Sequence, residues 1–110
     1  MNEVIQTIVS KSGANIRPTY KQWGHIVESH DYMAGNLDLI LETIEDPDYI
    51  VHGWTDELIA LKLSGKIAIA KQHVIVVYKE SGNEGFVITA FMTSKPDSLM
   101  KRGIVWQRQL

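Results

Sequence analysis

The sequence contains no cysteine and no long uninterrupted run of apolar residues. The absence of cysteine excludes disulfides, thiolate metal ligands and thiol catalysis, and it is typical of proteins kept in a reducing compartment. The longest apolar runs, such as Val74–Val77, are far shorter than the about 18 residues that suggest a membrane span. The first residues carry an early acid but no basic leader, so we expect no signal peptide and a cytoplasmic location.

Lysine and arginine are also absent between Glu28 and Glu57, a segment that holds nine acids. The remaining residues hold eleven bases and four acids, so the net charge of −2 divides into −9 for this segment and +7 elsewhere. Two interpretations are open. The basic side could face a polyanion, or the acidic helix surface could pair with a basic sheet in the same molecule.

Two helices are predicted in the first half of the chain. Thr19 followed three residues later by Gln22 has the form of a capping box, so one helix should run from Thr19 to about Ser29. The second helix should end at Asp46-Pro47, because the residue before proline avoids helical geometry. Its apolar face follows the i, i+3, i+4, i+7 rule and consists of Leu37, Ile40, Leu41 and Ile44.

From Tyr49 onwards the pattern predicts strands. Apolar, β-prone residues are concentrated in segments 49–52, 58–63, 66–71, 74–79 and 86–93, and such short breaks favour an antiparallel meander. A first strand at 4–9, a helical turn at 98–102 and a short strand at 104–106 are further expectations. The expected fold class is α+β: two N-terminal helices packed on a curled antiparallel sheet of four to five strands, in one domain spanning residues 1–110.

Two of the four histidines, His25 and His30, lie in the first predicted helix. They are five residues apart, or about 140° around the helix, which argues against a metal-binding pair of the i, i+4 kind. We therefore predict no metal site and no cofactor. His30 falls on the apolar side, where a packed histidine is usual, and His25 on the polar side, where a solvated one is usual.

The sequence has no phosphate-binding glycine loop, nucleophile elbow, zinc-protease motif or dinucleotide fingerprint. The remaining histidine, arginine, lysine, threonine and tyrosine side chains suit metal-independent RNA cleavage. That reaction needs a base for the 2′-hydroxyl, an acid for the leaving oxygen, and cations or hydroxyls for the phosphorane charge.

Three candidates for this chemistry lie in the predicted strands. Thr89 interrupts an apolar run, and alternation places it on one face with Val87 and Phe91. Lys71 and Tyr78 also lie among apolar strand residues. Each has a structural interpretation too: a hydroxyl bonded to a neighbour for Thr89, a solvated strand-end cation for Lys71 and a core aromatic for Tyr78.

The segments IRPTYKQWGHIVESH, ILETIEDPDYI, VIVVYKE, GFVITAFMTSK and GIVWQ resemble, in this order, a family of small cyanobacterial-type proteins of unknown function. That family is similar to the barnase–EndoU–colicin–RelE group of nuclease folds. The resemblance covers roughly residues 16 to 107. It implies a cleft between the helices and the concave sheet. The implied catalytic residues are Arg17, His25, His30 and Thr89. We further expect Lys71, Tyr78 and Lys95 to bind the substrate.

The expected function is therefore that of a metal-independent, toxin-like ribonuclease. RNA would be its substrate, and a neutralising protein would be its partner. The alternative is a non-catalytic protein-interaction module, in which the acidic helix pair meets a basic partner.

Overall fold

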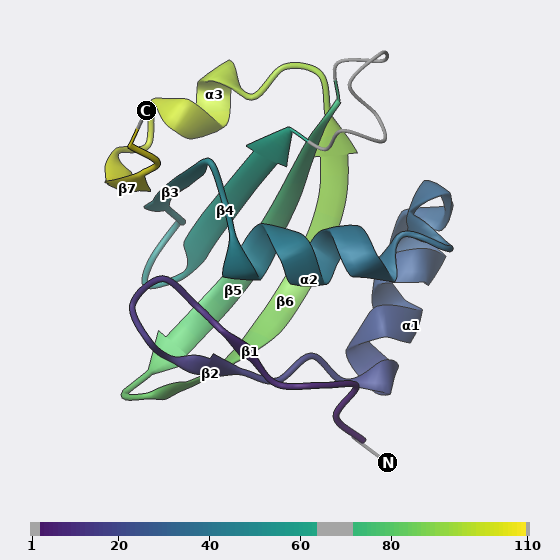
Figure 1. Ribbon diagram of the computed structural model, residues 1–110. Coiled ribbons are helices and arrows are strands. Elements are labelled where there is room, and N and C mark those ends of the chain that lie inside the picture. Colours follow the sequence, from purple (N-terminus) through teal and green to yellow (C-terminus); the bar gives the residue numbers. More distant parts are fainter. Residues whose placement is uncertain (1–2, 64–71, 110) are drawn as a thin grey trace.

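The computed structural model describes residues 3–63 and 72–109 (Figure 1). The strand predicted at 66–71 lies outside these residues. The described elements are β1 (Ile8–Val9), β2 (Asn15–Ile16), α1 (Tyr20–Ser29), the 3₁₀ helix η1 (Asp31–Met33), α2 (Leu37–Glu45), β3 (Tyr49–His52), β4 (Leu58–Leu63), β5 (His73–Ser81), β6 (Glu84–Thr93), α3 (Asp97–Met100) and β7 (Ile104–Gln107).

The described strands form one curled sheet of seven strands, in the order β1-β2-β6-β5-β4-β3-β7 (Figure 1). Its centre is the predicted antiparallel meander from β3 to β6. The prediction of two N-terminal helices on a purely antiparallel sheet of four to five strands is wrong. Two short strands precede α1, and β2 runs parallel to β6. The short strand expected at 104–106 is present as β7 and adds an edge strand beside β3, so the described strands number seven. Strands of two residues are too short to produce a periodic pattern that sequence inspection can detect.

The two faces of the sheet are covered by different elements. In Figure 1, α2 crosses the front face and α1 stands beside β6 at the sheet edge. Buried residues from α1 and α2, such as Ile26, Ile40 and Ile44, pack there against the sheet. On the other face, Leu99 and Met100 of α3 pack against a second buried cluster, which consists of Val51, Ile59, Leu61, Ile75 and Val77.

A β-bulge changes the side-chain alternation of β6. Val77 pairs with Thr89, but the next residue, Tyr78, pairs with Val87, so β6 contains one extra residue at Ile88. Val87 therefore joins the core beneath α1 and α2, whereas Thr89 lies opposite Val77 of the second cluster. The prediction that Val87 and Thr89 share a face is wrong, because strict alternation does not hold across a bulge.

Candidate functional site

An open pocket of about 470 Å³ lies where the start of α1 meets the first half of β6. We call it the α1–β6 pocket. Two basic side chains, one imidazole and one exposed phenyl ring contribute to its wall. Its lining residues are Arg17, Thr19, Lys21, Gln22, His25, Phe86 and Val87.

Strand β2 places Arg17 at one end of the pocket. Asn15 and Ile16 pair in parallel with Glu84 and Gly85 of β6, and the backbone N–H of Arg17 donates to the carbonyl of Gly85 at 3.0 Å. A β-carbon at position 85 would lie 2.5 Å from the carbonyl oxygen of Lys79 on β5 and 2.6 Å from Cδ1 of Ile16, so this part of β6 packs as it does because residue 85 is glycine. The Arg17 side chain then forms an ion pair with Glu84, and both side chains remain substantially exposed, at 40% and 51%.

The N-terminus of α1 positions the other polar groups. The Thr19 hydroxyl accepts a hydrogen bond from the backbone N–H of Gln22 at 3.1 Å, which confirms the predicted threonine cap. The Gln22 amide does not complete the capping box; it donates instead to the carbonyl of Ile88 on β6. Gln22 therefore ties α1 to the edge of β6, and the pocket lies between two connected elements.

Lys21 and His25 are four residues apart, and so they lie on the same side of α1. The His25 side chain is 57% exposed, and its Nδ1 atom lies 3.9 Å from a carboxylate oxygen of Glu28. Within the described ranges, no acid forms an ion pair with Lys21. Lys21 and His25 thus present a cation and a titratable ring to the solvent in the pocket.

His30, the second helix histidine, lies away from this pocket at the C-cap of α1. Its Nδ1 atom is 3.3 Å from the Tyr32 hydroxyl, and its ring centroid is 5.8 Å from that of Phe91. The Tyr32 hydroxyl also accepts a hydrogen bond from the backbone N–H of Met92. These contacts pack His30 against β6, as its place on the apolar side of the helix suggests.

The other candidates are dispersed. Thr89 lies on the opposite face of the sheet from Val87, and Lys95 lies beyond the end of β6, with its side chain exposed. Tyr78 is buried, and this burial, together with the charge of Glu80, raises the pKa of its phenol. Lys71 lies outside the described residues. Of the implied site residues, the pocket therefore brings together only Arg17 and His25.

Sequence reasoning missed two pocket residues, Lys21 and Phe86. Lys21 had a detectable signal, because it precedes His25 by one helical turn. Phe86 had none. Its side chain is 51% exposed although phenylalanine in a strand normally indicates burial, and its place in the pocket depends on how α1 meets β6.

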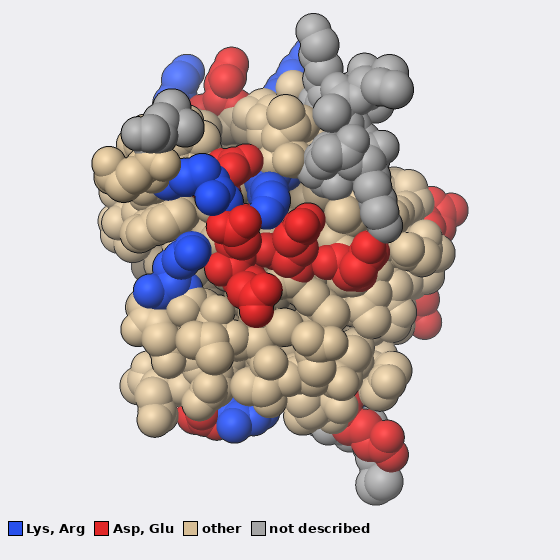
Figure 2. Space-filling view, in the orientation of Figure 1, with Lys and Arg blue, Asp and Glu red and all other residues tan. Residues whose placement is uncertain are grey.

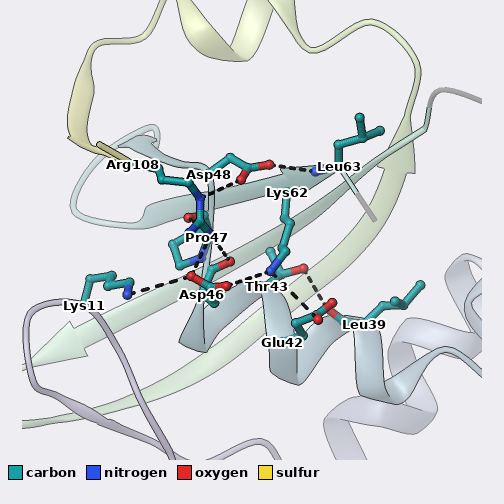
Figure 3. Close-up of polar contacts among 10 residues, drawn as sticks. All are labelled: Lys11, Leu39, Glu42, Thr43, Asp46, Pro47, Asp48, Lys62, Leu63 and Arg108. Carbon is teal, nitrogen blue, oxygen red and sulfur yellow. Dashed lines mark hydrogen bonds and ion pairs between the residues drawn. The ribbon is translucent and has the colours of Figure 1, made fainter. Parts of the chain in front are cut away.

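The acidic segment is concentrated on another surface. Figure 2 shows acidic side chains gathered on the face that α2 crosses, with basic side chains beside them. Figure 3 shows the contacts at the end of α2: Asp46 bonds with Arg108 at 2.6 Å and with Lys62 at 3.1 Å. Hydrogen bonds from Arg108 and then from Lys62 hold the pKa of Asp46 below its usual value. Glu42 and Asp48 also pair with these two bases.

These ion pairs within the molecule compensate part of the acidic charge of residues 28–57. A further acid, Asp56, pairs with Lys79 of β5 at 3.1 Å. Among the described residues, the acids of this segment with a recorded lysine or arginine partner include Glu42, Asp46, Asp48 and Asp56. The interaction-module alternative stays a prediction, but these four charges are already engaged within the molecule.

Within residues 3–63 and 72–109, no three histidine, aspartate or glutamate side chains lie close enough together to hold a metal ion. None of the helices in that part of the chain is long and apolar enough to cross a membrane. No protein-family model, curated protein or solved structure matches the chain. The resemblance to the barnase–EndoU–colicin–RelE group therefore stays a prediction.

Proposed function

We propose that this protein binds single-stranded RNA in the α1–β6 pocket and cleaves it without a metal ion, with His25 as the acid–base group. The observation that carries the proposal is that Arg17, Lys21, His25 and Phe86 line one open pocket. We also infer a cytoplasmic location, which the lack of cysteine supports.

The lining residues suit the two parts of a nucleotide. Guanidinium and ammonium groups bind phosphate oxygens through charge-assisted hydrogen bonds, and Arg17 and Lys21 supply one of each. An exposed aromatic ring accepts a stacked base of any identity, and Phe86 supplies that ring. Because phosphate contacts and base stacking carry no direct sequence information, the expected preference is for single strands with little sequence discrimination.

His25 is the proton-transfer group in this proposal. Imidazole is the side chain most often used for proton transfer near neutral pH. The 2′-oxygen of the substrate would form a new bond to phosphorus while the bond from phosphorus to the 5′-oxygen breaks. His25 would accept the 2′ proton, and a water molecule would supply one to the leaving oxygen. The products would be a 2′,3′-cyclic phosphate and a free 5′-hydroxyl.

The donor set of the pocket also favours chemistry without a metal. Its lining residues include one imidazole but no carboxylate, whereas the magnesium ions of many nucleases prefer carboxylate oxygens. Lys21, which has no acid partner among the described residues, would repel a divalent cation, and Arg17, although paired with Glu84, adds a second positive charge to the pocket wall. The same two charges could stabilise the additional negative charge that develops on phosphorus during cleavage.

The test is incubation of the purified protein with fluorescein-labelled single-stranded RNA in the presence of EDTA. We expect cleavage to cyclic-phosphate products, and a loss of about 100-fold or more in the His25→Ala variant. His52→Ala is the matched control, because His52 is an exposed histidine on β3, outside the pocket. Absence of cleavage at micromolar protein, or equal cleavage by His25→Ala, would contradict the catalytic part of the proposal.

Binding is measured separately with 2′-O-methyl RNA, which lacks the nucleophilic hydroxyl and cannot be cleaved in this way. Arg17→Ala and Lys21→Ala should each weaken this binding by about tenfold, the value of a lost charged hydrogen bond. Lys101→Ala removes an exposed charge outside the pocket, just after α3, and should have little effect. Equal affinity of the wild type and both pocket variants would contradict the proposed binding site.

A further inference from the structure

Arg17 and Lys21, the two cations of the α1–β6 pocket, differ in whether an acid already neutralises them. The Arg17 guanidinium is paired with the carboxylate of Glu84, which also accepts a hydrogen bond from the Asn15 amide at 3.3 Å. No acid among the described residues forms an ion pair with Lys21, its neighbour in the pocket. The carboxylate of Glu84 thus already occupies the Arg17 cation, whereas Lys21 is available to an anion of the ligand.

We propose that Glu84 competes with phosphate for Arg17, so that the first phosphate of a bound strand lies beside Lys21 and only a second, tethered phosphate displaces Glu84 from Arg17. The inference rests on the proposed RNA binding and adds to it the order in which the two cations bind phosphates. A mononucleotide would place its phosphate beside Lys21 and His25, where no carboxylate has to be displaced. In a longer strand, a second phosphate would then displace the Glu84 carboxylate and bind beside Arg17.

The exchange is feasible because the Arg17–Glu84 pair lies at the surface. The two side chains are 40% and 51% exposed, and exposed ion pairs contribute little net stability. The carboxylate released by the incoming phosphate becomes hydrated, and the local backbone stays held by the β2–β6 pairing. A phosphate already tethered through the first nucleotide competes at a high effective concentration, whereas a free phosphate does not.

The experiment compares two ligands that differ by one nucleotide, and therefore by one phosphate, and that cannot be cleaved. These are 2′-O-methyluridine 5′-monophosphate and the 5′-phosphorylated 2′-O-methyluridine dinucleotide, with binding followed by titration calorimetry. Glu84→Gln should strengthen dinucleotide binding about two- to fivefold, the range for loss of an exposed ion pair, and leave mononucleotide binding nearly unchanged. Asp97→Asn, at the start of α3 outside the pocket, removes the same charge and should alter neither affinity.

A double-mutant cycle then tests whether Glu84 acts through Arg17. In an Arg17→Ala background, Glu84→Gln should have no effect on either ligand. The inference is overturned if Glu84→Gln strengthens both ligands equally, has no effect, or weakens the dinucleotide, since the last result would mean that Glu84 orients Arg17 for binding. If the wild-type protein binds neither ligand nor longer 2′-O-methyl RNA, the proposed function fails as well. If it binds RNA but Glu84→Gln is silent, only the competition of Glu84 for Arg17 fails.

Discussion

The guanidinium of Arg108 donates to a carboxylate oxygen of Asp46 at 2.6 Å and so joins the chain just after β7 to the end of α2. Arg108 also bonds with Asp48 at 3.0 Å and with the carbonyl oxygens of Asp46 and Pro47 at 3.1 Å (Figure 3). One side chain thereby satisfies the backbone at the α2–β3 connection and compensates two acids. It connects the helix layer with the edge of the sheet.

Arg108→Ala should therefore destabilise the protein. We expect a lower urea midpoint than that of the wild type, because several charge-assisted hydrogen bonds are removed, although solvent screening at this exposed site keeps the effect modest. The measurement is urea unfolding followed by circular dichroism. Lys101→Ala is the control, as an exposed cation for which the structure records no ion pair within the described ranges. Equal urea midpoints for Arg108→Ala and wild type would contradict a stabilising role.

The lowered pKa of Asp46 predicts acid sensitivity. Arg108 and then Lys62 lower this pKa in the folded state below the value in the unfolded chain. The unfolded state then binds more protons as the pH falls, so the contribution of Asp46 is complete above its unfolded pKa and is lost as the pH falls through its folded pKa. Asp46→Asn should reduce the urea midpoint at pH 7, and this reduction should shrink progressively as the pH falls below 3.8, the ordinary pKa of the carboxyl group. A constant difference across this range would argue against the ion pairs as the cause.

The raised pKa of the Tyr78 phenol predicts that the protein loses stability at high pH. Burial, and secondarily the charge of Glu80, raise the pKa of its phenol in the folded state. Above about pH 10, the ordinary pKa of tyrosine, the unfolded chain releases this proton more readily, so stability should fall as the pH rises further. Tyr78→Phe should unfold at a higher pH than the wild type in an alkaline titration, with Tyr20→Phe, an exposed tyrosine, as control. Identical alkaline midpoints for the wild type and Tyr78→Phe would contradict this prediction.

Two glycines should respond to alanine with opposite signs. A β-carbon at Gly85 would lie 2.5 Å from the carbonyl oxygen of Lys79 and 2.6 Å from Cδ1 of Ile16, so Gly85→Ala should cost about 1–3 kcal/mol. A β-carbon at Gly24, inside α1, would meet no atom within 4 Å. Gly24→Ala should therefore stabilise by about 0.5–1 kcal/mol through higher helix propensity. Thermal and urea unfolding measure both, and destabilisation by Gly24→Ala would show an unrecognised constraint on α1.

Phe86 should contribute to RNA affinity if it provides a stacking surface. Phe86→Ala is expected to weaken binding of 2′-O-methyl RNA by about 1–3 kcal/mol, the value of one stacked base. Because the ring is 51% exposed, its removal should affect stability less than it affects affinity. Tyr20→Ala is the matched control, since Tyr20 is an exposed aromatic residue of α1 that does not line the pocket. Equal losses of affinity in the two variants would contradict a specific role for Phe86.

The parts of the fold that could be predicted depend on local patterns. The apolar spacing in α2, the threonine cap of α1 and the strands at 49–52 and 58–63 arise from residues that are near neighbours in the sequence. The site was predicted less completely. Arg17 and His25 do share a pocket, but His30 and Thr89 lie elsewhere. These positions could not be predicted, because a helix wheel and strand alternation do not show where α1 meets β6 or where a bulge occurs.

The sequence by itself determined the available chemistry, the charge asymmetry and the main local elements, since each follows from composition or from contacts within one turn or one strand. Only the tertiary structure decided that Arg17 pairs with Glu84, that Asp46 pairs with Arg108 and that Thr89 lies on the opposite face from Val87. These relationships depend on strand register and on pairing between distant segments. A shift of one residue in register reverses the face of every following side chain, and no local pattern specifies it across a bulge or a strand of two residues.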